Sequence, residues 1–245
     1  MMNLSDKEKR YYSRQLPILK EKGQKKLKNK TVLIGGIGGI GSSAALSLAR
    51  MGVGEIIIVD DDKVDLSNLN RQQLYSENDV GKPKTKIAKQ KLEKINSNID
   101  IKLINKKIDQ NNIPHILDES IDAFIDGFDN IETRYVVNKR CMEKKIPYIH
   151  ASCEGMEGRI TLIIPNETPC LHCIYQGKKP RQKEPIPVMG FLPNKLGVME
   201  AEQFYRFTFN LKTLKNKILI FSKDKMEPSI LKIEKNKNCE ICQET

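Results

Sequence analysis

The order of apolar and polar positions predicts strands that alternate with helices over the first two thirds of the chain. Short, nearly continuous apolar runs are typical of buried strands, and longer stretches carry apolar residues at the helical period. The strands predicted in this way are Thr31–Ile34, Glu55–Val59, Ile101–Ile104, Ala123–Ile125 and Tyr148–Ile149. The helices predicted between them are Ser42–Met51, Lys84–Asn96, Ile113–Ser120 and Ile131–Lys145. This alternation predicts a Rossmann-like α/β fold, a mostly parallel sheet with helices on both faces.

The pattern changes near both ends of the chain. Two exposed helical segments, Leu4–Arg10 and Leu19–Lys28, suggest an N-terminal helical arm of about residues 1–28. After Gly158 we expect further elements that extend the same sheet in a partly antiparallel manner: strand Arg159–Ile164, helix Leu196–Phe209, and strands Lys217–Phe221 and Ile230–Ile233. The interpretation is a single domain, residues 1–245, with a C-terminal extension of about residues 159–245.

A glycine-rich loop follows the first predicted strand. Gly36, Gly38 and Gly41 fit the pattern G-x-G-x-x-G directly before a helical stretch. Glycines let the backbone approach a phosphate, and a helix N-terminus offers unpaired N–H groups. Asp60 ends the next apolar run, at the distance where an acid that binds ribose belongs. The loop therefore indicates a nucleotide, either a redox cofactor or a substrate; a strand-to-helix turn without a ligand is the alternative.

Two Cys-x-x-Cys pairs, Cys170 with Cys173 and Cys239 with Cys242, are the second chemical signal. Each pair holds two thiolates on a tight turn, and two such turns make a tetrahedral site for structural Zn²⁺. The zinc would tie the last residues to the middle of the fold. Reduced cysteines without metal are the alternative, and His172 is interpreted as a turn residue.

Two charged stretches lie near expected strand ends. Arg71 and Lys84 have the charge needed to hold a triphosphate, and a solvated basic loop is the alternative. Asp129 follows the fourth predicted strand, where a carboxylate can hold Mg²⁺. The alternative is that Asp129 or Asn130 caps the next helix.

Composition narrows the class of protein. With 245 residues, 39% apolar and 30% charged, the chain is long enough to bury a full core. No run approaches the ~20 apolar residues that cross a bilayer, and the N-terminus shows no apolar signal core, so we expect a cytoplasmic protein without a membrane partner. The net charge is +11, but the lysines are dispersed and not interleaved with aromatic residues. We therefore expect no nucleic-acid partner; an acidic protein partner and a lysine- and isoleucine-rich genome explain this charge equally well.

Taken together, these motifs resemble the ubiquitin-activating-like adenylyltransferases, the family that includes ThiF, MoeB and HesA. The resemblance spans about residue 10 to the C-terminus. The matching pieces are Arg14-Gln15, Gly36 to Gly41, Asp60-Asp61-Asp62, Ser67 to Gln72, Gly81 to Lys84, Asp126 to Asn130, Met156 to Arg159 and both cysteine pairs in order.

The resemblance implies that the chain adenylates a carboxylate with ATP, usually the C-terminal glycine of a ubiquitin-fold sulfur-carrier protein. It implies that Gly39 lies against the nucleotide, and that Asp129 binds Mg²⁺. It also implies a homodimer in which Arg14 reaches the triphosphate of the other subunit. The nucleotide-binding positions carried over are Gly36, Gly38, Gly39, Gly41, Asp60 (ribose), Asp62, Ser67, Asn68, Arg71, Gln72, Lys84, Asp129 and Asn130, of which Asn68, Arg71 and Lys84 hold the phosphates.

One departure from the family concerns the cysteine to which some members transfer the acyl group. That position falls near Ile186, and no cysteine lies between Cys173 and Cys239. Of the remaining thiols, Cys141 is interpreted as a packed hydrophobe, and nothing in the sequence indicates an activated Cys153. We therefore predict adenylation without a covalent enzyme thioester. The basic segment 178–184 either gates the acceptor channel or forms a surface turn.

Three other functions fit parts of the sequence. An enzyme of the same fold that adenylates a small-molecule carboxylate is the first; a relative of this kind activates guanylylpyridinol during iron-guanylylpyridinol cofactor synthesis in methanogens. An NAD-dependent oxidoreductase explains the glycine loop and Asp60, but it leaves Arg71, Lys84, Asp129 and the cysteines without a role. A catalytically silent interaction module that retains the fold is the third.

Overall fold

The structure is a computed structural model that describes residues 3–118, 120–176 and 186–243. These residues form one eight-stranded sheet with the order β3-β2-β1-β4-β5-β6-β7-β8. The strands are β1 (Thr31–Gly35), β2 (Glu55–Val59), β3 (Asp100–Ile104), β4 (Ala123–Asp126), β5 (Tyr148–Glu154), β6 (Glu157–Ile163), β7 (Lys217–Ser222) and β8 (Lys225–Lys232). The first five strands of the chain are parallel, and β6, β7 and β8 continue the sheet antiparallel. The predicted architecture is confirmed.

The strand order reverses between β1 and β4. From β1 the chain continues outward through β2 to β3, and it then returns to the other side of β1 to form β4. Gly35, the last residue of β1, therefore lies in register with Val59 of β2 and Asp126 of β4. In open α/β sheets such a point leaves a crevice at the carboxyl ends of the strands, where ligands bind.

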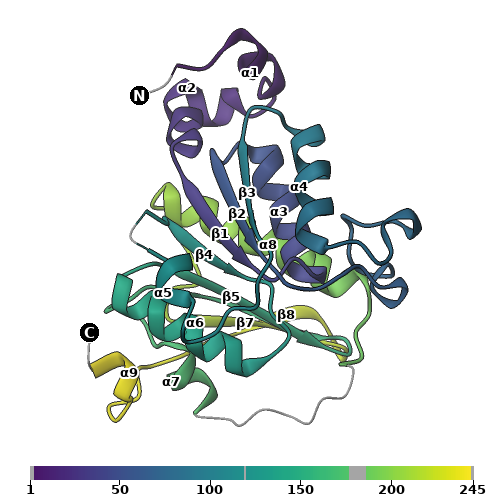
Figure 1. Ribbon diagram of the computed structural model, residues 1–245. Coiled ribbons are helices and arrows are strands. Elements are labelled where there is room, and N and C mark those ends of the chain that lie inside the picture. Colours follow the sequence, from purple (N-terminus) through teal and green to yellow (C-terminus); the bar gives the residue numbers. More distant parts are fainter. Residues whose placement is uncertain (1–2, 119, 177–185, 244–245) are drawn as a thin grey trace.

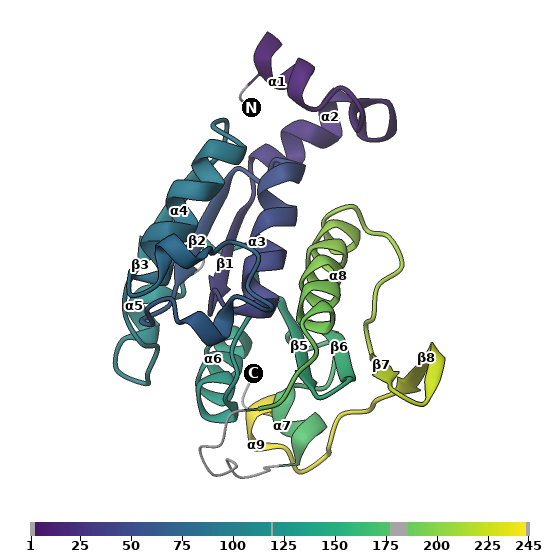
Figure 2. The same cartoon turned by 90° about the vertical axis from the view of Figure 1, so that its right-hand side faces the viewer.

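Helices cover both faces of the sheet (Figures 1 and 2). One face packs against α3, α4 and α8, and the other packs against α5, α6 and α7, as the two main hydrophobic clusters show. The helices are α1 (Asp6–Tyr11), α2 (Leu16–Lys28), α3 (Gly39–Met51), α4 (Lys84–Ile95), α5 (Ile113–Ile116), α6 (Ile131–Lys144), α7 (Leu171–Tyr175), α8 (Phe191–Thr208) and α9 (Glu240–Gln243). Short 3₁₀ turns, Leu66–Asn68 and Glu77–Asp79, interrupt the segment between β2 and α4.

Burial explains why the central strands could be predicted from the sequence. Val32, Leu33 and Ile34 of β1 are fully buried, with alternate side chains in the two clusters on opposite faces of the sheet. A strand covered on both faces needs apolar residues at consecutive positions, which is the pattern that predicted it. The length of β5 was underestimated, because beyond Ile149 the strand is set by its antiparallel pairing with β6.

Two predicted helices differ most from their expected bounds. The helix predicted as Ile113–Ser120 ends at Ile116, since Leu117 is extended and fully buried, and its carbonyl accepts a hydrogen bond from Arg140 Nε at 3.1 Å. α8 begins at Phe191, five residues before the predicted start. Pro193 lies in its first turn, where proline is compatible with a helix.

The first and last helices lie at opposite ends of the molecule. The N-terminal arm of α1 and α2 lies at one end, while α7 and α9 lie at the other (Figures 1 and 2). The hairpin of β7 and β8 forms the edge of the sheet, and β8 is exposed along almost its whole length. No helix among the described residues is both long and apolar enough to span a membrane.

Candidate nucleotide site and four-cysteine centre

The glycine loop lies at the crevice between β1 and β4. Gly36 has a φ of +83°, and a side chain at this position would contact the Gly127 carbonyl oxygen at 2.7 Å. Gly41 packs still closer, since an added Cβ would lie 1.9 Å from the Gly36 carbonyl oxygen. The Gly127 N–H donates to the Gly35 carbonyl at 2.8 Å, which joins the loops after β1 and β4. The loop thus requires glycine, and it places the N-terminus of α3 at the crevice.

Asp60 fixes the other side of the glycine loop. Its two carboxylate oxygens accept hydrogen bonds from the backbone N–H groups of Ile37 and Asp62, each at 2.8 Å. Burial raises the pKa of this carboxyl group, against the opposing effects of Lys84 and the two N–H donors. The acid predicted for the ribose therefore stands beside the loop and also holds its backbone.

Lys84 is the buried cation of the site. Its Nζ donates to Asp62 Oδ2 at 2.7 Å, and its backbone N–H donates to the Asp62 carbonyl at 2.9 Å. The Lys84 side chain is 7% exposed, whereas the Asp62 side chain is 65% exposed. Asp62, expected to bind the nucleotide, is thus the counter-ion of Lys84 in this structure.

Arg71 and Gln72 flank the glycine loop. An added Cβ at Gly39 would lie 3.5 Å from Arg71 Cγ, and one at Gly38 would lie 3.6 Å from Gln72 Nε2. Arg71 Nη1 donates to the Ser67 carbonyl at 2.8 Å and to Asn70 Oδ1 at 2.9 Å. Within the described residues no group donates to the buried Gln72 Oε1. An acceptor without a partner beside a glycine loop fits a site for a hydroxylated or aminated ligand.

Ser67 and Asn68, which are also predicted for the site, form a capping arrangement with Asp65. Ser67 donates both its backbone N–H and its hydroxyl to Asp65 Oδ1, and Asn68 Oδ1 accepts from the Asp65 N–H at 3.3 Å. The Asn68 and Arg71 side chains thus belong to one compact turn, in which Arg71 contacts both Ser67 and Asn70.

Asp129 and Asn130 follow β4 and have separate roles. Asn130 Oδ1 accepts from the Thr133 N–H at 2.9 Å, so Asn130 is the N-cap of α6. Asp129 is exposed, and within the described residues its carboxylate accepts only a long hydrogen bond from Asn130 Nδ2, at 3.4 Å. The capping alternative is confirmed for Asn130, and the Asp129 carboxylate remains available to a ligand.

Arg14 does not join the site of its own chain. It is exposed in the turn between α1 and α2, where the neighbouring Gln15 donates to the Met51 carbonyl at 2.9 Å. Met51 ends α3, whereas the glycine loop lies at its start. A helix of 13 residues separates the two by about 20 Å.

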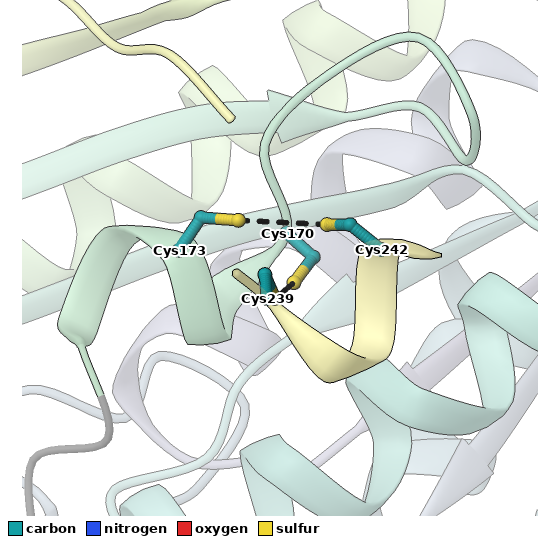
Figure 3. A group of neighbouring side chains, drawn as sticks. All are labelled: Cys170, Cys173, Cys239 and Cys242. Carbon is teal, nitrogen blue, oxygen red and sulfur yellow. Dashed lines mark hydrogen bonds between the residues drawn. The ribbon is translucent and has the colours of Figure 1, made fainter. Parts of the chain in front are cut away.

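The four cysteines of the two pairs converge, as Figure 3 shows. Their Sγ atoms all lie within 4.8 Å of one another, with 3.7 Å between Cys170 and Cys239 and 3.5 Å between Cys173 and Cys242. Tetrahedral zinc with Zn–S bonds of about 2.3 Å requires sulfur atoms about 3.8 Å apart. The Asn236 N–H also donates to Cys173 Sγ at 3.4 Å. The cluster fits a closed four-thiolate metal site.

The other two cysteines are not activated. Cys141 is buried in the core between α6 and the sheet, which confirms its interpretation as a packed residue. Burial raises the pKa of the Cys153 thiol to about 11, although Arg134 and Arg71 oppose the shift. The basic segment 178–184, considered as a gate, lies outside the described residues.

Three residues of the site were missed in the sequence. The Tyr75 hydroxyl donates to the Ile37 carbonyl in the glycine loop at 3.0 Å and also lies 3.4 Å from the Lys84 carbonyl. Pro193 of α8 covers Gly39, since an added Cβ there would lie 2.9 Å from Pro193 Cβ. Arg134 donates to Asp126 at 3.0 Å beneath the Asp129 loop. Only Arg134 carried a signal, a cation one helical turn after the Asn130 cap.

The fold and the glycine loop at its crevice define an α/β protein of the Rossmann type with a four-cysteine centre. The chain matches the ThiF family over residues 12–241, and it belongs to this family.

Relatives with names and solved structures support this membership. The heterocyst HesA protein of Trichormus variabilis is 35% identical, covering 99% of this chain and 91% of its own length. The ThiS sulfur-carrier adenylyltransferase of Bacillus subtilis is 42% identical over 62% of this chain and 46% of its own length. The structure of Escherichia coli MccB with ATP superposes with a TM-score of 0.81 at 29% identity, covering 95% of this chain and 74% of that one. The chain is thus an enzyme of the adenylyltransferase class.

Proposed function

We propose that this enzyme transfers the adenylyl group of ATP to a carboxylate, releases pyrophosphate and forms no covalent thioester with its own cysteines. The observation that carries the proposal is the pair of cations beside the glycine loop. Arg71 flanks Gly39. Lys84 Nζ pairs with Asp62, and Asp60 accepts from the backbone N–H groups of both Asp62 and Ile37 in the loop. Neutralising and positioning a triphosphate is what adenylyl transfer requires of a protein.

The reaction then needs little from the protein besides orientation. A carboxylate oxygen of the acceptor attacks the α-phosphorus, the bond from that phosphorus to the bridging oxygen breaks, and pyrophosphate leaves. The acceptor is already ionised at neutral pH, so no general base is needed. Asp60 binds the ribose, and Asn68, Arg71 and Lys84 hold the phosphates. Lys84 exchanges its exposed partner Asp62 for a phosphate oxygen when ATP enters.

Asp129 is proposed as the residue that holds Mg²⁺ on the nucleotide. Its carboxylate is exposed at the same strand edge as the glycine loop, and carboxylate oxygen is the ligand type that Mg²⁺ prefers. When bound, the metal neutralises phosphate charge. Arg14, remote from its own glycine loop, is proposed to reach the triphosphate of a second copy of the chain in a homodimer.

The cysteine centre is proposed to bind structural Zn²⁺. Four thiolates leave no open coordination position, so the metal would hold α7 against α9 and take no part in adenylyl transfer. Zinc content close to one ion per chain, in protein purified without chelator, is the expected result.

The proposed acceptor is the C-terminal glycine of a ubiquitin-like sulfur-carrier protein. The Bacillus relative is named for such a carrier, and the net charge of +11 suits an acidic partner through electrostatic steering. A small-molecule carboxylate is the second candidate. It is favoured by the absence of any cysteine between Cys173 and Cys239 in the sequence, since transfer to an enzyme thiol is then unnecessary.

Pyrophosphate exchange into ATP tests the proposal and separates the two acceptors. We expect exchange that depends on a carrier ending in Gly-Gly, and its loss in Arg71→Ala but not in Lys86→Ala, which changes an exposed lysine on α4. Exchange with a small acid and not with the carrier would select the second candidate. Tight NAD binding without ATP affinity would contradict both.

A further inference from the structure

A hydrogen-bonded network of buried and half-buried polar side chains runs from the cysteine centre to the loop that carries Asp129. It begins at Tyr175, the last residue of α7, two positions after Cys173. The Tyr175 hydroxyl lies 2.7 Å from His150 Nε2, and His150 Nδ1 lies 2.5 Å from Asp126 Oδ2. Arg134 Nε donates to the same Asp126 oxygen at 3.0 Å. This network thus crosses from α7 through β5 and β4 to α6.

Asp126 and Arg134 together fix the backbone directly before Asp129. The Phe128 N–H donates to Asp126 Oδ1 at 3.1 Å, and Arg134 Nη2 donates to the Phe128 carbonyl. Arg134 Nη2 also donates to the Ala151 carbonyl of β5 at 3.1 Å. Both backbone polar groups of Phe128 are therefore held by this ion pair, and the position of Asp129 follows from it.

The protonation states determine which group donates and which accepts in each hydrogen bond of this network. Burial acts to raise the pKa of Asp126, but Arg134, His150 and Tyr148 outweigh it and hold the pKa below its usual value. Burial lowers the pKa of His150, so its ring is neutral near pH 7. The Nδ1–H then donates to Asp126, and Nε2 accepts from the Tyr175 hydroxyl, which leaves one orientation of the ring.

We propose that His150 and Tyr175 are positioning residues for the Asp129 loop, so that the cysteine centre supports metal–nucleotide binding as well as the attachment of α9. This inference rests on the proposed function. Among the described residues Tyr175 is the partner of His150 Nε2, so loss of its hydroxyl leaves this nitrogen without that hydrogen bond in a site where the ring is 1% exposed. The ring is then free to reorient, and the support that it gives to Asp126 and Phe128 weakens.

The expected size of the effect on binding follows from the number of residues through which Tyr175 acts on Asp129. Outer partners of metal ligands contribute about 10- to 100-fold to metal affinity. Tyr175 acts through His150 and Asp126 and not on Asp129 directly, so the lower end, about 10-fold, is expected for Tyr175→Phe. A ligand-independent structural role would instead weaken nucleotide binding equally with and without Mg²⁺.

Calorimetric titration with ATP, in the presence and absence of Mg²⁺, tests the proposal. Tyr175→Phe is expected to weaken binding about 10-fold with Mg²⁺ and to leave binding without Mg²⁺ unchanged, at unchanged zinc content. His150→Asn, which keeps an N–H for Asp126, should show a similar loss, and the double variant no more than either single one. Tyr12→Phe, which removes the buried hydroxyl that accepts from Asn96 Nδ2 at the far end of α3, is the matched control.

Three results would overturn the inference: no loss in Tyr175→Phe, an equal loss in both titrations, or a fall in zinc content or thermal midpoint that accounts for the loss. Failure of the proposed function is seen separately, because the wild-type chain would then bind no ATP in either titration.

Discussion

The nucleotide edge and the cysteine centre differ in how their polar groups are satisfied without a ligand. At the nucleotide edge the buried charges are already paired, Lys84 with Asp62 and Asp60 with two backbone N–H groups. At the cysteine centre four thiols face one another, and the Asn236 N–H is one further donor. Once these thiols ionise, only a cation can balance them.

This difference separates function from stability. The buried charges of the edge are balanced without ATP, so changing a residue proposed to hold the phosphates removes an interaction with the substrate and costs little folding free energy. The centre is balanced only by metal, so changing one cysteine removes metal binding, which is coupled to folding. The two regions therefore predict opposite responses to substitution.

The largest expected effect is at the cysteine centre. Cys239→Ser should abolish stoichiometric zinc and lower the free energy of unfolding by about 4 kcal/mol or more, because the bound metal stabilises only the folded chain. Denaturant unfolding and elemental analysis measure the two quantities. Cys153→Ser, outside the cluster, is the control. Unchanged stability together with lost zinc would remove the distinction between the two regions.

The next effect is at the nucleotide edge, and it concerns activity. Lys84→Ala should lower pyrophosphate exchange about 10²- to 10³-fold, the usual contribution of a group that stabilises developing charge. Its partner Asp62 is 65% exposed and stays solvated, so the thermal midpoint should change little. Lys86→Ala, on the exposed side of the same helix, should leave exchange intact. A large fall in stability for Lys84→Ala would contradict the comparison.

The third prediction concerns the ion pair between Lys91 and Asp79, which has no proposed role in adenylyl transfer. Lys91 and Ser76 lower the pKa of Asp79 to about 2, against the opposing effect of its burial. Because this value lies below the ordinary 3.8, the pair stabilises the fold above about pH 4, and the contribution disappears as the pH falls through about 2. Asp79→Asn should therefore cost about 1–2 kcal/mol at pH 7 and much less at pH 2.

Unfolding curves of both proteins from pH 2 to pH 7, combined with exchange assays, measure this effect. The two stabilities should converge at low pH while pyrophosphate exchange at pH 7 stays within about twofold of wild type. A constant difference at every pH would mean that Asp79 contributes through packing and not through its charge.

The two regions could be predicted from the sequence to different extents. Each cysteine pair and the glycine loop is a local motif, so spacing along the chain predicts it. The convergence of the two pairs was predicted from the chemistry of a four-thiolate zinc site. The sequence could not distinguish Asn130 from Asp129 as the cap of α6, because both residue types cap helices. Tyr75 and His150 were missed because their roles come from neighbours distant in the chain, Ile37 and Tyr175. The early end of α5 has the same origin, a bond from Arg140 that no local pattern encodes.

The smallest expected effect is at Cys153, near the end of β5. With a pKa of about 11, only about one thiol in ten thousand is ionised at pH 7, too few for an efficient nucleophile. Cys153→Ser should therefore leave pyrophosphate exchange and zinc content unchanged. Mass spectrometry of the enzyme incubated with ATP and carrier should find no acyl or persulfide adduct. An adduct at Cys153 would show that the nucleotide edge passes its product to the enzyme's own thiol, and adenylation would then be the first of two steps.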